Sequence, residues 1–228
     1  WYYNEYESET RRAYTESYLL TFEQLADIID TESAFYHALR TQYTRPATTV
    51  AGFSDVSVNH WAASFIQTVA ASGRMQGSDG TFRPDEEITA AEVCATIVRS
   101  QQLPDASEPM EGLPADAWYT PEVSAAAAAG LLDGLDDFQP EAAISRADTM
   151  QIFANLLVKQ GSQLPDEQTV EQTLSAFSDA DTIPDDRRAA VVLCMQQGLI
   201  SGYADGTLQP DYTITRCEFA KLLTVITG

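Results

Sequence analysis

Apolar residues recur at helical spacing in several short parts of the chain. The first stripe covers residues 61–72, and Gly73 follows it at the position where a left-handed residue would end a helix. Similar apolar faces start at Val93, Met150 and Phe219. The pattern predicts an all-α protein in which six helices, arranged as three pairs, bury their apolar faces together.

A hydroxyl residue stands three positions before an acid at the start of each later apolar face. The pairs are Thr89 and Glu92, Ser145 and Asp148, and Thr215 and Glu218. This spacing is typical of a capping box, in which the hydroxyl and the acid satisfy backbone N–H groups at a helix start. We expect the Asp148 version to be the weakest, because aspartate has the shorter side chain.

The same order of residues occurs three times along the chain. Two glycines four positions apart are followed by a proline, then by an isoleucine four residues later and by an acid four residues after that. The positions are Gly73, Gly77, Pro84, Ile88 and Glu92; Gly130, Gly134, Pro140, Ile144 and Asp148; and Gly198, Gly202, Pro210, Ile214 and Glu218. We therefore predict helix-loop-helix repeats over residues 53–103, 113–160 and 177–228, stacked on one shared core.

The first copy carries most of a known motif. It contains Phe53, Asp55, Val56, His60, Trp61, Ala62, Gly73, Gly77, Asp79, Gly80, Phe82, Pro84, Ile88, Thr89 and Glu92. In order and spacing the three copies resemble the S-layer homology family. They depart from it at Ala90, where the family has an arginine, and at Asp186, which stands where the other copies have a tryptophan.

The resemblance implies a pseudo-threefold bundle with grooves between neighbouring repeats. It also implies that these grooves hold cell-wall polysaccharide, often one bearing a pyruvylated sugar. The expected function is therefore a non-catalytic module that anchors a secreted protein to the bacterial cell surface. The alternative is a divergent repeat domain that mediates protein–protein contacts or surface-layer assembly.

Arg146 and Arg216 are the first candidates for binding such a ligand. Each occupies the first position of a predicted helix, where a positive charge meets the positive end of the helix dipole at a small cost. A guanidinium beside unpaired N–H groups at a helix start would suit the carboxylate of a pyruvyl ketal. The alternative is a surface ion pair with a neighbouring acid. We expect the loss of either arginine to weaken wall binding, that of Arg216 more than that of Arg146, and to leave folding nearly unchanged.

Two tryptophans and two aspartates are further candidates. Trp61 and Trp118 could offer a flat apolar face to a sugar ring, although a large aromatic at the start of a helix is at least as often a core residue. Asp55 and Asp179 could accept sugar hydroxyls or cap the following helix. The sequence does not separate these alternatives.

Charge and hydropathy limit the kinds of partner that the chain is expected to bind. The chain has 13 lysines and arginines against 34 acids, a formal net charge of -21, which argues against nucleic acid as a partner. No apolar run is long enough to predict a membrane span. No cofactor or metal is expected, since the Asp-Gly turns lack the alternating ligands of a calcium loop. Residues 1–50 read as a helical segment and linker of unassigned role.

Overall fold

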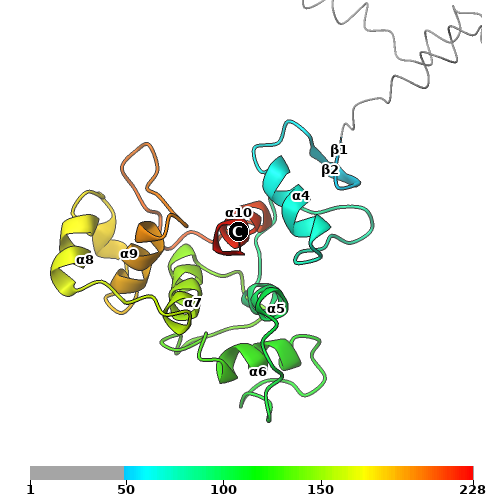
Figure 1. The fold of residues 1–228 in the computed structure, drawn as a ribbon, viewed down its shortest axis with the longest axis horizontal. Helices are drawn as coiled ribbons and strands as arrows, with labels where there is room; N and C mark the ends of the chain where they lie inside the picture. Colours follow the sequence, from blue (N-terminus) through cyan, green and yellow to red (C-terminus); the bar gives the residue numbers. More distant parts are fainter. Residues whose placement is uncertain (1–48, 228) are drawn as a thin grey trace, which may run out of the picture. The chain divides into compact units, whose positions relative to one another are not determined.

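The predicted repeats are helical in the computed structural model, which describes residues 49–227, all of them in the unit formed by residues 48–228. The first repeat contributes α4 (Ala63–Ala71) and α5 (Ala90–Gln101), the second α6 (Thr120–Ala128) and α7 (Arg146–Lys159), and the third α9 (Arg188–Gln196) and α10 (Arg216–Thr227). A mostly helical fold is thus confirmed (Figure 1). The helical segment predicted before residue 49 lies outside the described residues.

A β-hairpin and an additional helix were not predicted, and the hairpin makes the all-α description incomplete. Strands β1 (Thr49–Val50) and β2 (Phe53–Ser57) form an antiparallel hairpin. Its two turn residues, Ala51 and Gly52, both have positive φ, but the Asn-Gly or Asp-Gly signal typical of such a turn is missing. Helix α8 (Glu167–Leu174) follows the second repeat and buries only Val170 and Leu174, a pattern too sparse to predict a helix.

The helix ends follow the sequence signals. Gly73 comes just after α4 with φ +70°, as predicted for a left-handed terminating residue. Thr89 and Glu92 form a complete capping box. Ser145 caps the N–H of Asp148, but the Asp148 carboxylate bonds to the Ser145 hydroxyl at 2.9 Å rather than to its backbone, so the second cap is the weakest, as predicted.

Three isoleucines, one from each repeat, join their backbones in a closed cycle. The N–H of Ile88 donates to the carbonyl of Ile214 (3.0 Å), that of Ile214 donates to Ile144 (3.2 Å), and that of Ile144 donates to Ile88 (3.2 Å). All three side chains are buried. We call this cycle the isoleucine ring. It ties the first, second and third repeats together at a single place.

Each long helix then begins against the loop of another repeat. The first N–H of α5 donates to Ala142 (3.0 Å), that of α7 to Tyr212 (2.8 Å), and that of α10 to Glu86 (2.9 Å). The second N–H groups donate to the carbonyls of Pro140, Pro210 and Pro84 respectively. These donors have no partner within their own helix, so the neighbouring loop satisfies them. The expectation of unpaired N–H groups at these helix starts is therefore wrong.

The shorter helices also pack across repeat boundaries. α6 packs on α5 of the preceding repeat, α9 packs on α7, and α4 of the first repeat packs on α10 of the last. Figure 1 shows α5, α7 and α10 side by side, with α4, α6 and α9 outside them. The pairs that pack together therefore join helices of different repeats rather than the two helices of one repeat, and the pair α4–α10 closes the set.

This closure predicts that the repeats do not fold separately. Removing residues 177–228 takes away α10, which covers α4, and α9, which covers α7, and it opens the isoleucine ring. We expect the shortened chain to lose its cooperative thermal transition, measured by circular dichroism, because the apolar faces of α4 and α7 become exposed. A cooperative transition at the melting temperature of the intact chain would contradict this account.

Candidate functional site

Three grooves lie at the starts of the long helices, and each contains parts of different repeats. The Arg216 groove, with a volume of about 130 Å³, is lined by Arg216, Glu92 and Trp118. The Arg146 groove, about 310 Å³, is lined by Arg146, Glu218 and Trp61. The Ala90 groove, about 180 Å³, is lined by Ala90, Asp148 and Arg187. The first two bring together the predicted arginines and tryptophans.

The guanidinium of Arg216 is fully engaged inside the protein. Its Nη1 pairs with Glu92 Oε1 at 3.0 Å, its Nε donates to the carbonyl of Phe82 at 2.9 Å, and its Nη2 donates to the carbonyl of Gln76 at 3.0 Å. The group also lies over the Phe82 ring, and the residue is only 4% exposed. Arg216 therefore connects the third repeat to the first, which is more than a surface ion pair.

Burial lowers the pKa of Arg216, and the Glu92 carboxylate acts in the opposite direction. Because an arginine stays charged in a protein, the buried cation has to be paired. The expectation that its loss would leave folding nearly unchanged does not fit these contacts. A ligand-binding role for Arg216 stays a prediction.

Arg146 is held far less tightly. Its Nη2 makes one long hydrogen bond, 3.4 Å, to the carbonyl of Ser201, and its guanidinium lies 5.2 Å from the centre of the Tyr203 ring. Its Nε is buried, with no hydrogen-bond partner among residues 49–227. No ion pair joins Arg146 to Glu218 in that part of the chain, in contrast to Arg216 and Glu92. The Arg146 groove therefore contains a cation with unused donor capacity.

The loops that contact the two arginines differ in length. Ser201 and Gln76 occupy the same place in their repeats, three residues after the first glycine, and each accepts from an Nη2. The following loop runs from Gly77 to Phe82 in the first repeat and from Gly202 to Leu208 in the third, which is one residue longer. Arg216 donates to the Phe82 carbonyl of the shorter loop, whereas Arg146 lies over the Tyr203 ring of the longer loop.

Trp61 and Trp118 are surface residues in two of the grooves. They are 55% and 59% exposed, so the alternative of a core role is wrong. Each ring rests against a neighbouring aromatic ring, Phe65 for Trp61 and Tyr119 for Trp118. Both therefore present a broad apolar face to the solvent beside a groove.

Asp55 and Asp179 fasten the loops. Asp55 accepts the N–H groups of Phe82 (2.9 Å) and Arg83 (2.7 Å), and Asp179 accepts those of Leu208 (2.9 Å) and Gln209 (2.7 Å). Capping of the following helix is not what they do. Partial burial raises the pKa of Asp55, but the two N–H donors outweigh it and hold that pKa below its usual value.

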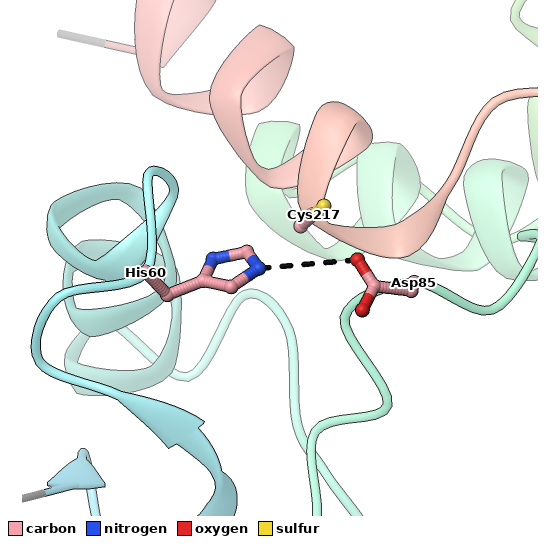
Figure 2. A group of neighbouring side chains, drawn as sticks. All are labelled: His60, Asp85 and Cys217. Carbon is pink, nitrogen blue, oxygen red and sulfur yellow. Dashed lines mark ion pairs between the residues drawn. The ribbon is translucent and has the colours of Figure 1, made fainter.

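One cluster has the residue types of a metal site. His60 Nε2 lies 3.8 Å from an oxygen of Asp85, and Cys217 Sγ is close to both (Figure 2). However, His60 Nδ1 accepts the N–H of Ala62 at 3.1 Å, so in the neutral ring Nε2 carries the proton. A metal-bound histidine instead donates from its second nitrogen. The cluster fits a polar contact between the first and third repeats better than it fits a metal.

Comparison with known proteins identifies the family of the three repeats. The family model of the S-layer homology domain matches residues 52–94, 114–150 and 176–220, which is more than half of the chain. The chain belongs to the S-layer homology domain family. The three matches start within one residue of the predicted repeat starts, and they confirm three tandem copies.

Individual relatives include two bacterial surface proteins and one enzyme. The chain is 27% identical over 175 residues to an S-layer protein of Bacillus thuringiensis subsp. finitimus, covering 75% of this chain and 21% of the relative. It is 42% identical over 96 residues to cell surface glycoprotein 1 of Acetivibrio thermocellus, covering 41% of this chain and 4% of the relative. An amylopullulanase of Thermoanaerobacterium thermosulfurigenes is 27% identical over 175 residues, covering 75% of this chain and 9% of the enzyme.

These matches locate the protein. S-layer homology repeats and S-layer relatives indicate a secreted protein of the bacterial cell surface, as predicted. The chain spans about a fifth or less of the length of these relatives. None of the helices within residues 49–227 is long and apolar enough to cross a membrane.

The two arginines should differ sharply in their effect on stability. Arg216→Ala leaves Glu92 and two backbone carbonyls without their partner, and we expect a loss of roughly 2 to 4 kcal/mol in the free energy of unfolding. Arg146→Ala removes one long hydrogen bond and a ring contact, at a cost of about 1 kcal/mol or less. Urea unfolding followed by circular dichroism measures both. Equal losses would show that the described contacts of Arg216 do not carry its stabilising role.

Proposed function

We propose that the three repeats form a pseudo-threefold bundle that anchors the protein to cell-wall polysaccharide, and that the Arg146 groove is its main binding site. The closed isoleucine ring and the three equivalent helix contacts across repeat boundaries support the symmetry. The observation that carries the binding site is that Arg146 lines this groove while its guanidinium makes a single long hydrogen bond and no ion pair among the described residues.

The guanidinium of Arg146 has N–H donors that the described residues do not use, and an anionic ligand in the groove can accept from them. A carboxylate that accepts from two N–H groups of one guanidinium forms the two-pronged geometry that arginine favours. A pyruvyl ketal on a sugar supplies such a carboxylate, and the adjacent hexose supplies hydroxyl groups. The proposed ligand is therefore a pyruvylated wall polymer.

The rest of the Arg146 groove suits a sugar. Trp61 is exposed at its edge and offers a flat face on which the C–H side of a hexose ring can pack. Glu218 lines the groove and can accept sugar hydroxyls, and Lys221 adds a second positive charge. Tyr203, which is 39% exposed, packs its ring against the Arg146 guanidinium. Charge and apolar surface thus occur together in a chain that is otherwise strongly acidic.

The Arg216 groove is the second proposed site. Trp118 is exposed beside it, and Arg99 lines it together with Arg216. Because Arg216 is already paired with Glu92, an anion there has to share the cation with an acid. We therefore expect weaker binding than in the Arg146 groove, which reverses the order expected from the sequence. Asp55 and Asp179 contribute by fixing the loops that border the grooves, through the N–H groups described above.

The anchoring role is non-catalytic in this proposal. The match to the amylopullulanase covers only 9% of that enzyme, so the resemblance concerns a short part of it. Net charge also shapes the interaction, because a protein of charge -21 repels an anionic polymer at long range while a local guanidinium attracts it.

Isothermal titration with a methyl hexoside that carries a 4,6-pyruvyl ketal tests the proposal, with the unmodified hexoside as the ligand control. We expect Arg146→Ala to lower the affinity roughly ten-fold or more, which corresponds to the loss of a charge-assisted hydrogen bond of about 1.5 to 3 kcal/mol. Trp61→Ala should lower it as well, because the stacking face is lost.

Lys159→Ala is the matched control for Arg146→Ala. Lys159 is an exposed cation at the opposite end of the same helix, α7, so its removal changes the net charge equally. Unchanged affinity in Arg146→Ala, or an equal loss in Lys159→Ala, would contradict the proposed site. Retained surface attachment without any sugar binding would favour the alternative of protein–protein contacts.

A further inference from the structure

The Ala90 groove lacks the arginine of the other two grooves, yet an arginine occupies it. Arg187, which directly precedes α9, has a side chain only 11% exposed, and its Nε lies 3.0 Å from Asp148 Oδ1. Asp148 holds the same place in its repeat as Glu92, the acid that pairs with Arg216. The acid of the Ala90 groove is therefore neutralised from α9 rather than from α5, where the first helical residue is Ala90.

The backbone carbonyl that would correspond to the Gln76 acceptor already has a hydrogen-bond donor. In the Arg216 groove the third residue after the first glycine, Gln76, presents its carbonyl to the arginine. The corresponding residue in the second repeat is Asp133, and its carbonyl accepts from Asn155 Nδ2 at 3.0 Å. The carbonyl that corresponds to the Gln76 acceptor is thus already bonded within the second repeat.

The aromatic platform is replaced by an acid. Asp186 stands where Trp61 and Trp118 stand in the other repeats, twelve residues before the first glycine. Its carboxylate pairs with Arg187 Nη1, so the one cation lies between Asp186 and Asp148. Asp137 also lines the groove. The balance of these groups is negative, and no tryptophan is available for a sugar ring.

We infer that Arg187 closes the Ala90 groove to the anionic polymer, so that the module binds through two grooves. Arg187 acts as a positioning residue that pairs with Asp148 in place of the missing arginine of the first repeat. Asp186 also pairs with Arg187, so both interactions of this cation are with acids of the protein. This inference rests on the proposed function for the meaning of the two open grooves. The two ion pairs that Arg187 forms, with Asp148 and with Asp186, are present without any ligand.

The first test measures whether the Ala90 groove binds in the natural chain. The probe is the methyl hexoside with the 4,6-pyruvyl ketal, and the variant is Trp61→Ala/Trp118→Ala, which changes two exposed side chains and should fold normally. We expect at most two equivalents bound to the unchanged chain and a loss of saturable binding in the double variant. One equivalent retained by the double variant with the affinity of the unchanged chain would overturn the inference, because only the Ala90 groove is left unaltered.

The second test opens the groove. In Ala90→Arg/Asp186→Trp/Arg187→Ala the residue pattern of the other two grooves is restored. We expect one additional equivalent of the same hexoside compared with the unchanged chain. A folded triple variant with unchanged stoichiometry would count against the role assigned to Arg187.

The third test needs no ligand and applies even if the triple variant unfolds. Arg187→Ala should lower the melting temperature by several degrees, since it leaves Asp148 and Asp186 unpaired. Adding Ala90→Arg should restore most of that loss, because the new guanidinium can reach Asp148 from α5. Ala90→Arg alone should not stabilise the protein, because Arg187 already holds Asp148. An equal effect of Ala90→Arg with and without Arg187 would overturn the inference.

Failure of the proposed function looks different. If the unchanged chain binds no pyruvylated hexoside, the anchoring chemistry is wrong, and the melting temperatures still decide whether Arg187 replaces the missing arginine.

Discussion

The isoleucine ring is the constraint on which the rest of the described structure depends. Three buried backbone hydrogen bonds connect Ile88, Ile144 and Ile214 in a cycle, so each repeat is both donor and acceptor to a different neighbour. A single bond of this kind contributes about 1 kcal/mol net. Its larger effect is geometric, because a closed cycle fixes the register of all three chain segments at once.

The grooves follow from that register. Two residues after each ring isoleucine a long helix starts, at Ala90, Arg146 and Arg216, and its first N–H groups bond to the loop of another repeat. The side chain at the first helical position therefore points into a groove whose walls belong to a neighbour. The third repeat supplies the cation to the first, and the second supplies it to the third. Where the first repeat has only Ala90, Arg187 supplies it instead.

Much of this architecture could be predicted from the sequence because it depends on residue patterns within short segments of the chain. Turn glycines, capping pairs such as Thr89 and Glu92, and apolar faces gave the long helices and the triplication. The hairpin was missed because Ala51 and Gly52 lack the usual turn residues, and α8 because it buries only two side chains.

The sequence identified several residues that line the grooves, but it did not predict which of them are buried and paired and which are open to a ligand. Arg146 and Arg216 stand in equivalent places, yet Arg146 makes one long hydrogen bond while Arg216 is buried and bonded to Phe82 and Glu92. Arg187 gave no signal, since its partners Asp148 and Asp186 come from different repeats and the motif has no arginine there. Contacts between segments far apart in the chain decided these roles, and no local pattern reports them.

Native-state hydrogen exchange of the Ile88, Ile144 and Ile214 amides tests the central claim most directly. If the ring holds the three repeats in one cooperative unit, all three amides should exchange only through global unfolding. Their free energies of opening would then equal one another and the free energy of unfolding from urea denaturation. A markedly lower opening free energy at any one of the three would show that the ring opens locally, and would contradict the account.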